Sequence, residues 1–221
     1  PGWVEGVIQA KSFIKSGMAN KCLVIGSDTL SRVTDDNDRD SMIYADGSGA
    51  IILESNNSDD SGILSHNSAT YTFEGENEFI YYGSSYNPKL RQNSNQKYIK
   101  MQGRKVYEFA LTNVPAAMKD CFDESNCKIE NLKKIFIHQA NKKMDEAIIK
   151  RFFRLYKMSP PKDVLPMNIE EYGNSSVATI PTLFDLVKKS DYKGHKLVKG
   201  DLIMFASVGA GMNINAITYQ I

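Results

Sequence analysis

Apolar side chains recur along this chain at two spacings, one typical of helices and one typical of buried strands. Between Val4 and Ser16 they recur every three or four residues, and Gly17 is placed to end the predicted helix. Two short apolar runs, 21–26 and 49–54, are bounded by turn residues and predict buried strands. Helix, strand, long loop and strand in this order are typical of an α/β layered protein, in which the two strands could be parallel or form a hairpin.

The same alternation returns in the carboxyl-terminal part of the chain. Helices are predicted over 106–122, 139–153 and 175–188, and strands over 134–137, 202–208 and 212–219. The last two strands are separated by Gly209, Ala210 and Gly211, so we expect them to pair as a hairpin.

The middle of the chain differs in composition, because Asn, Ser, Asp, Gly and Tyr dominate it. These residues suit turns and loops, so residues 56–100 are interpreted as a linker and surface excursion with one or two strands near 62–72. The excursion could be an elaborated loop or a lid that shapes a substrate site. It would separate an amino-terminal region, 1–55, from a carboxyl-terminal region, 101–221.

Composition narrows the class of protein. A chain of 221 residues with 42% hydrophobic residues can bury a core. Its 27 Lys and Arg and 26 Asp and Glu leave a net charge of +1, which gives no general attraction to nucleic acid or anionic lipid. No apolar run approaches the roughly 20 residues of a membrane-spanning helix. Cys22, Cys121 and Cys127 do not form a disulfide framework or a zinc motif, which favours a reducing, cytoplasmic setting.

Three polar or glycine-rich positions stand at the ends of predicted elements. His138 ends an apolar strand, where open α/β sheets place their ligands, although a structural core histidine is the simpler interpretation of a single His. Asn174 precedes a predicted helix and could cap it. The glycine turn 209–211 permits close approach of the backbone to a ligand. His66 and His195 are predicted to be solvated surface residues.

The segments around these positions resemble a known family. IFIHQAN (135–141), YGNSSVATIP (172–181) and FASVGAGMNINAI (205–217) are similar, in order and spacing, to ketoacyl-acyl carrier protein synthase III, a condensing enzyme of the thiolase superfamily. GWVEGVIQAKSFIKSG (2–17), DDNDR (35–39) and YADGSGAIILE (44–54) extend the resemblance over nearly the whole chain except residues 55–100. The resemblance implies a thiolase-like layered α/β/α/β/α fold, of which this chain is the carboxyl-terminal two thirds.

The resemblance also implies a reaction. Family members hold an acyl group from acyl-CoA on a cysteine and attack it with the carbanion formed by decarboxylating malonyl-acyl carrier protein. By resemblance, His138 Nε2 and the Asn174 amide stabilise the enolate of the malonyl thioester. The backbone N–H at Ala210, beside Gly209, falls in the oxyanion hole for the acyl-cysteine, at a position where the family commonly has glycine.

Further residues are assigned by resemblance to binding. Arg39 matches the arginine that contacts the nucleotide end of coenzyme A, although it could be a solvated charge. Lys143 matches a basic position presented to acyl carrier protein, although any surface lysine fits that description. Asn141 is grouped with the substrate-binding residues. Trp3 lies where the acyl pocket of the family begins and could limit chain length or simply pack in the core.

The family's nucleophilic cysteine precedes a glycine by two positions, and Gly2 matches that glycine. We therefore expect the nucleophile immediately before Pro1, at the end of a preceding segment of roughly 100 residues, a usual share of a domain this size. No metal or redox cofactor is expected, because ligand clusters and a dinucleotide fingerprint are missing from the sequence. A homodimer is expected. The alternative function is a non-catalytic paralogue that binds a partner synthase.

Overall fold

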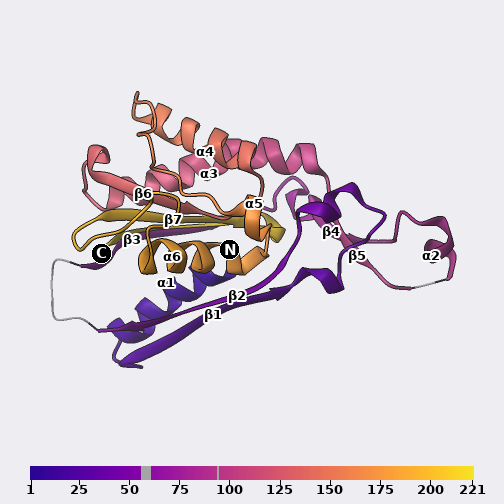
Figure 1. Ribbon diagram of the computed structural model, residues 1–221, viewed down its shortest axis with the longest axis horizontal. Coiled ribbons are helices and arrows are strands. Elements are labelled where there is room, and N and C mark those ends of the chain that lie inside the picture. Colours follow the sequence, from indigo (N-terminus) through magenta and orange to yellow (C-terminus); the bar gives the residue numbers. More distant parts are fainter. Residues whose placement is uncertain (56–60, 94) are drawn as a thin grey trace.

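The computed structural model describes residues 1–55, 61–93 and 95–221, which form stacked layers of helices and sheets (Figure 1). Helices α3 and α4 cover one face of a four-stranded sheet, and α1 and α6 lie between the other face and a two-stranded sheet. The helices are α1 (Gly2–Lys15), α2 (Pro88–Asn93), α3 (Gly103–Glu124), α4 (Lys142–Leu155), α5 (Ile169–Tyr172) and α6 (Thr179–Lys189). The strands are β1 (Lys21–Thr29), β2 (Asp46–Glu54), β3 (Gly62–Thr70), β4 (Ile80–Gly83), β5 (Tyr98–Met101), β6 (Leu132–Ile137), β7 (Leu202–Gly209) and β8 (Asn213–Gln220).

The larger sheet has the order β3-β8-β7-β6. Its central strand β7 is buried along almost its whole length, as expected for a continuous apolar run covered by helices on both faces. β7 and β8 form the predicted antiparallel hairpin, and β6 runs parallel to β7. β3 pairs with β8, so residues 62–70 of the predicted excursion lie in this carboxyl-terminal sheet.

The smaller sheet consists of β1 and β2, which pair antiparallel from Lys21 opposite Glu54 to Thr29 opposite Asp46. Of the two arrangements left open by the sequence, the hairpin is therefore the one adopted. The predictions that 21–26 and 49–54 are buried strands are wrong. Val24 is buried against α1, but Leu23 and Ile25 in β1 are 62% and 60% exposed, and Ile52 in β2 is 66% exposed. Successive strand residues face opposite sides, so one helix layer can cover only alternate positions.

Two apolar clusters hold these layers together. One joins α3 and α4 to the larger sheet, and the other fills the space between α1, α6 and the opposite face of that sheet. In the second cluster Phe136 and Phe205 lie with ring centres 5.7 Å apart, and Trp3 meets Phe205 edge to face at the same distance. Because α1 and α6 pack on the same sheet, the start of α1 comes close to the ends of β6 and β7.

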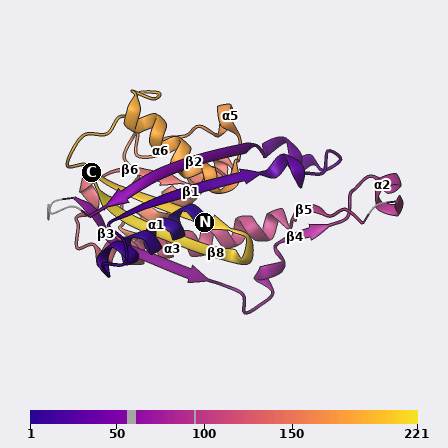
Figure 2. The ribbon, with the colours of Figure 1, turned by 90° about the horizontal axis from the view of Figure 1, so that it is seen from below.

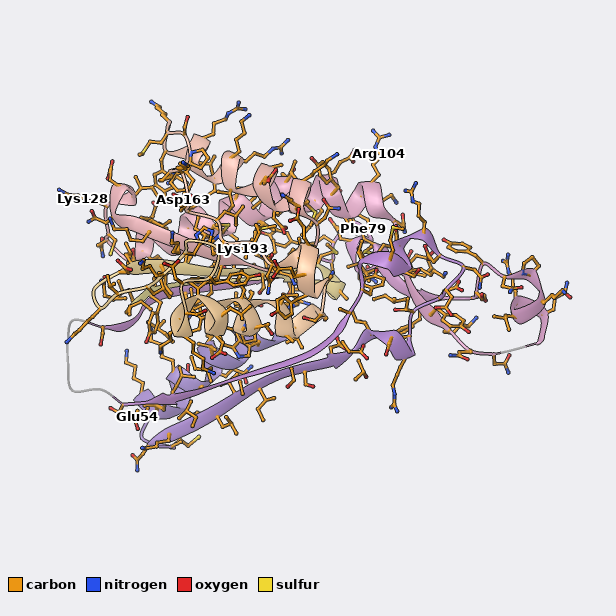
Figure 3. The ribbon with its side chains drawn as sticks, viewed as in Figure 1. Glu54, Phe79, Arg104, Lys128, Asp163 and Lys193 are labelled. Carbon is orange, nitrogen blue, oxygen red and sulfur yellow. The ribbon has the colours of Figure 1, made fainter. Side chains whose placement is uncertain are left out.

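An arm formed by β4, α2 and β5 projects beyond the body of the molecule (Figures 1 and 2). β4 and β5 pair antiparallel, and the sequence did not predict either of them. At the base of the arm, Phe79 packs edge to face against Phe109 of α3, with ring centres 6.5 Å apart (Figure 3). The arm is therefore anchored to the body by apolar contacts at its base.

A buried charge cluster also fixes the arm. Lys100 of β5 is 2% exposed, and its ammonium lies 2.6 Å from Asp35 and 2.9 Å from Asp38. Burial by itself would raise the pKa of Asp35, but hydrogen bonds from Lys100, from the backbone N–H of Tyr86 and from neighbouring groups hold it well below its usual value. The cluster ties the arm to the loop between β1 and β2.

A second buried carboxyl gives a stability prediction. Asp145 in the first turn of α4 is 1% exposed, and burial raises its pKa well above the usual value. The unfolded chain loses this proton near pH 4, so stability falls as the pH rises from about 4 toward the folded-state pKa. Asp145→Asn should therefore raise the free energy of unfolding at pH 7.5 by about 1–3 kcal/mol, the cost of burying an imperfectly paired polar group.

Urea unfolding of the Asp145→Asn variant at pH 7.5 and pH 4.5 measures this effect. The gain over wild type should shrink at the lower pH, because the pH is then closer to the pKa of the unfolded aspartate and keeping the proton in the folded state costs less. Glu130→Gln, at an exposed position outside α4, is the matched control and should leave stability unchanged at both values. A loss of stability in Asp145→Asn at pH 7.5 would contradict the assignment of a buried, protonated carboxyl.

Candidate active site

A cavity of about 300 Å³ opens where the ends of β6 and β7 meet the start of α1. Its walls come from widely separated parts of the chain and are mostly apolar. Most of the wall is formed by Pro1, Gly2, Leu30, Ile80, Ile99, Met101, Val106, Ala140, Met144, Val177, Val208, Gly209, Ala210 and Met212. Four lining residues carry polar side chains: Tyr44, His138, Asn174 and Ser176. An apolar pocket with a few convergent polar groups is the usual form of a small-molecule site.

His138 follows the last residue of β6, and its backbone N–H still donates to the Ala206 carbonyl of β7 at 2.9 Å. Its side-chain Nδ1 lies 2.8 Å from the Thr179 hydroxyl. The ring borders the cavity but is otherwise surrounded by protein, and this burial lowers the pKa of His138 well below its usual value. The imidazole is therefore neutral at physiological pH.

Asn174 lines the same cavity as His138 and is only 8% exposed. Its backbone is held on both sides, because its N–H donates to the Ile43 carbonyl at 2.7 Å and its carbonyl accepts from Ala45 at 2.9 Å. The capping interpretation is wrong, because the helical turns that follow begin after Ser175 and Ala178. The side-chain Oδ1 of Asn174 instead accepts from the Ser176 N–H at 2.9 Å within the turn. This bond turns the amide so that Nδ2 is the atom left to donate to a ligand.

The turn after β7 brings the backbone against the start of α1. A Cβ on Gly209 would overlap the Pro1 Cδ atom and lie 3.2 Å from the Pro1 nitrogen, so only glycine fits there. Gly211 has a left-handed φ of 72°, which glycine adopts readily. Ala210 between them lines the cavity and is exposed. The close approach seen at this turn is to Pro1 of the same chain, and the approach of a ligand stays a prediction.

A substitution at this contact should be costly. Gly209→Ala forces α1 or the end of β7 to move and should lower the free energy of unfolding by about 1–3 kcal/mol, the usual cost of overpacking. Gly103→Ala at the start of α3 is the matched control, because a Cβ there meets no atom within 4 Å. Thermal unfolding of both variants measures the difference. Equal melting temperatures for the two would show that the close contact at Gly209 is not maintained in solution.

The remaining sequence-predicted site residues lie around the cavity but outside its lining. Arg39 is exposed and begins a short 3-10 helix, Arg39–Ile43, just before the lining residue Tyr44. Lys143 is exposed in the first turn of α4. Asn141 caps α4, with its Oδ1 accepting from the N–H groups of Lys143 and Met144 at 3.1 and 3.3 Å. Trp3 is 2% exposed and packs in the core, as one of its two interpretations has it.

The sequence did not single out several residues that shape the cavity. Thr179 contacts His138, Tyr44 stands next to Asn174 in the wall, and Ile80 and Ile99 bring the projecting arm to the site. The arm thus contributes to the wall of the cavity, while the lid and the plain-loop interpretations of the middle region both stay predictions. The only sequence signal for these residues is their place within or next to the resemblance segments, because their proximity depends on long-range packing.

The three cysteines lie away from the cavity lining. Cys121 is buried in α3 near the hydroxyls of Ser65 and Thr218, at 3.6 Å from each, and burial raises the pKa of its thiol. Cys22 and Cys127 are partly buried, and the three thiols are unpaired. A thiol with a raised pKa is a poor nucleophile, so Cys121 is a structural residue.

The part of the chain described by the structure contains no cluster of three or more His, Cys, Asp or Glu side chains suited to a metal ion. Within the same residues, every helix is too short or too polar to cross a membrane.

Two family models match the chain at its two ends. Residues 1–72 match 3-oxoacyl-[acyl-carrier-protein (ACP)] synthase III, and residues 122–221 match the carboxyl-terminal model of the same family. Only 73–121, which contains the projecting arm and most of α3, falls outside both matches. Both polar residues His138 and Asn174 and the glycine turn lie inside the second match.

Individual relatives agree with the family models. The chain is 33% identical over 228 residues to the beta-ketoacyl-(acyl-carrier-protein) synthase III of Porphyra umbilicalis, an alignment that spans 99% of this chain and 65% of the relative. It is 35% identical over 214 residues to a synthase III of Staphylococcus epidermidis, spanning 96% of this chain and 61% of that protein. The chain thus spans about 65% or less of the length of these two relatives.

Solved structures show the same fold. The structure superimposes on the 3-oxoacyl-(acyl-carrier-protein) synthase III of Aquifex aeolicus with a TM-score of 0.81 and 28% identity, covering 100% of this chain and 64% of that one. The synthase III of Thermus thermophilus gives a TM-score of 0.83 at 26% identity, covering 65% of its chain. The fold is therefore thiolase-like. Because family models match both ends and the fold is shared, the chain belongs to the 3-oxoacyl-[acyl-carrier-protein (ACP)] synthase III family.

Proposed function

We propose that the full-length protein containing this chain is an acyltransferase that condenses an acyl-CoA primer with malonyl-acyl carrier protein, with loss of carbon dioxide. The reaction would serve fatty-acid initiation or a related secondary-metabolite pathway. One observation carries the proposal: a neutral imidazole and an oriented amide, His138 and Asn174, meet in an apolar cavity at the start of α1. Family membership supports the choice of reaction.

The chemistry of this polar pair suits an enolate. When a malonyl thioester loses carbon dioxide, its thioester oxygen gains negative charge, and preorganised donors in a water-poor site stabilise that charge. Asn174 Nδ2 is the donor left over by the bond between its Oδ1 and Ser176. His138 presents its second ring nitrogen to the cavity because Nδ1 is taken by Thr179. The apolar walls strengthen both interactions by excluding water.

We also propose that the nucleophile is a cysteine immediately before Pro1. The proposal rests on the match of Gly2 to the family motif and on the place of Pro1 and Gly2 in the cavity wall. A thiolate at this point would stand at the amino end of α1, where the helix dipole stabilises negative charge and lowers the pKa of a thiol. The backbone N–H at Ala210, at the turn after β7, would then be available to the acyl-enzyme oxyanion.

The outer residues are proposed to bind the carriers. The exposed guanidinium of Arg39 would meet the nucleotide end of coenzyme A, and the exposed Lys143 would meet the acidic acyl carrier protein. Both thioesters, acyl-CoA and malonyl-acyl carrier protein, would be substrates, and the proposed reaction uses no metal or organic cofactor. We further propose that the protein is a homodimer and that a preceding segment of the same protein completes each subunit. The unpaired thiols fit a cytoplasmic location, where they would stay reduced.

Acylation of the full-length protein tests the proposed first half-reaction. Incubation with an acyl-CoA should add the mass of one acyl group, and peptide mapping should place it on the residue before Pro1. Substituting that residue by alanine should prevent the mass shift. An acyl group found on Cys22, Cys121 or Cys127 would contradict the assignment of the nucleophile. No acyl-enzyme with any of a series of short straight and branched primers would contradict the proposed reaction and favour the non-catalytic alternative.

A further inference from the structure

The Nδ1 atom of the His138 ring lies within hydrogen-bond distance of the Thr179 hydroxyl. Thr179, the first residue of α6, is 2% exposed and places its Oγ1 2.8 Å from His138 Nδ1. The same oxygen lies 2.9 Å from the carbonyl of Ser176. One hydroxyl therefore sits between two hydrogen-bonding atoms, one of which belongs to the imidazole.

The hydroxyl carries one proton and can give it to either neighbour. The Ser176 carbonyl already accepts from the backbone N–H of Thr179, so it stays paired if the hydroxyl turns toward the ring. If the hydroxyl donates to Ser176, its lone pair accepts from a protonated Nδ1, and Nε2 has a free lone pair. If it donates to Nδ1, the ring proton lies on Nε2, which becomes a donor. Both states use the same heavy-atom positions.

We infer that Thr179 is a positioning residue of this site. Its hydroxyl holds the neutral His138 ring with Nε2 toward the cavity and supports Nε2 as an acceptor or as a donor without movement of a heavy atom. This inference rests on the proposed function, whose two half-reactions need both forms. An acceptor suits the thiol of the nucleophile during acyl transfer, and a donor suits the thioester carbonyl of malonate during decarboxylation.

Burial explains why the hydroxyl matters. Nδ1 lies on the side of the ring that faces protein, where Thr179 Oγ1 is the side-chain atom within hydrogen-bond distance among the described residues. Without the hydroxyl, the backbone of Ser176 is the remaining partner of the ring, and because a carbonyl can only accept, it would hold the ring in one tautomer. Outer partners of functional histidines in metal sites have the same effect, because they fix both ring orientation and tautomer.

Matched substitutions separate this role from packing. Thr179→Val keeps the shape and volume of the side chain but removes the hydroxyl, and Thr179→Ser keeps the hydroxyl but removes the methyl group. In the full-length protein, Thr179→Val should lower kcat for malonyl-acyl carrier protein decarboxylation about 10- to 100-fold, the loss usual for removing an outer partner. KM should stay unchanged, and Thr179→Ser should keep kcat close to wild type.

A second readout does not depend on activity. Nitrogen-15 NMR of the His138 ring reports which nitrogen carries the proton, and its shifts should change in Thr179→Val but not in Thr179→Ser. Unchanged ring shifts in Thr179→Val would overturn the inference. Changed shifts together with an inactive wild type would mean that the proposed function alone has failed. Equal loss of kcat in the Val and Ser variants would also overturn it. Should Thr179→Val not fold, Thr179→Ala replaces it, with the same results expected.

Discussion

Replacing Asn174 or His138 by alanine is expected to lower the rate of malonyl-acyl carrier protein decarboxylation about 10²- to 10³-fold each, the usual effect of removing one preorganised donor to an oxyanion. The physical reason is that the enolate charge would face an apolar wall without a partner. Asn174 offers Nδ2 because its Oδ1 is held by Ser176, and His138 is kept neutral by burial. The measurement is release of carbon dioxide by the full-length protein at saturating substrate.

His66→Ala is the matched control, since His66 is exposed on β3 and does not line the cavity. It should retain wild-type rates. Both active-site variants should keep the far-ultraviolet circular dichroism of the wild type, because each truncates one side chain in a preformed wall. Wild-type decarboxylation in either Asn174→Ala or His138→Ala would refute the role given to that residue.

Lys100→Met should be the most destabilising of the substitutions considered. It leaves Asp35 ionised and buried, and breaking a buried pair in this way costs about 3–5 kcal/mol. The Asp35 carboxylate would still accept from Ser85 and from the backbone N–H of Tyr86, at 2.9 and 2.7 Å, but would lack its counter-charge. Urea unfolding at pH 7.5 measures the loss. Because the pKa of Asp35 is lowered in the fold, the loss should shrink as the pH falls below about 4.

The same substitution should also disturb the cavity. β5 continues from Lys100 into the lining residue Met101, and the N–H of Ile99 donates to Val33 at 2.8 Å, so the arm and the β1–β2 loop share one anchor. Lys97→Met, at an exposed position of the same arm, is the control and should change neither stability nor activity. Adding Asp35→Asn to Lys100→Met should restore part of the lost stability. Equal stability of Lys100→Met and wild type would contradict the account of the anchor.

Much of the fold could be predicted from periodicity. The helices around 4–16 and 106–122 and the hairpin of β7 and β8 appear close to their predicted ranges, because long apolar patterns outweigh local alternatives. The arm could not be predicted, because β4 and β5 are four residues long and rich in Tyr, Gly and Lys. Their pairing depends on a buried ion pair and on contacts with α3, which no local pattern contains.

The candidate site also contains residues that the sequence identifies and residues that only the fold identifies. His138, Asn174 and the glycine turn stand at the ends of elements and carry family motifs, so their sequence context identifies them. The start of α6 illustrates the limit: a threonine in a helix first turn is unremarkable until the fold places its hydroxyl at the histidine. The exposed side of β1 could not be predicted either, because its apolar run gives no sign of how many layers cover it.

The most direct test of the central claim is formation of the condensed product. The full-length protein would be incubated with an acyl-CoA and malonyl-acyl carrier protein, and the carrier protein would be analysed by mass spectrometry. The account predicts a 3-oxoacyl-acyl carrier protein that carries the primer plus two carbons, formed by wild type and lost in Asn174→Ala. Absence of both this product and carbon dioxide release, with a folded protein and a series of primers, would contradict it.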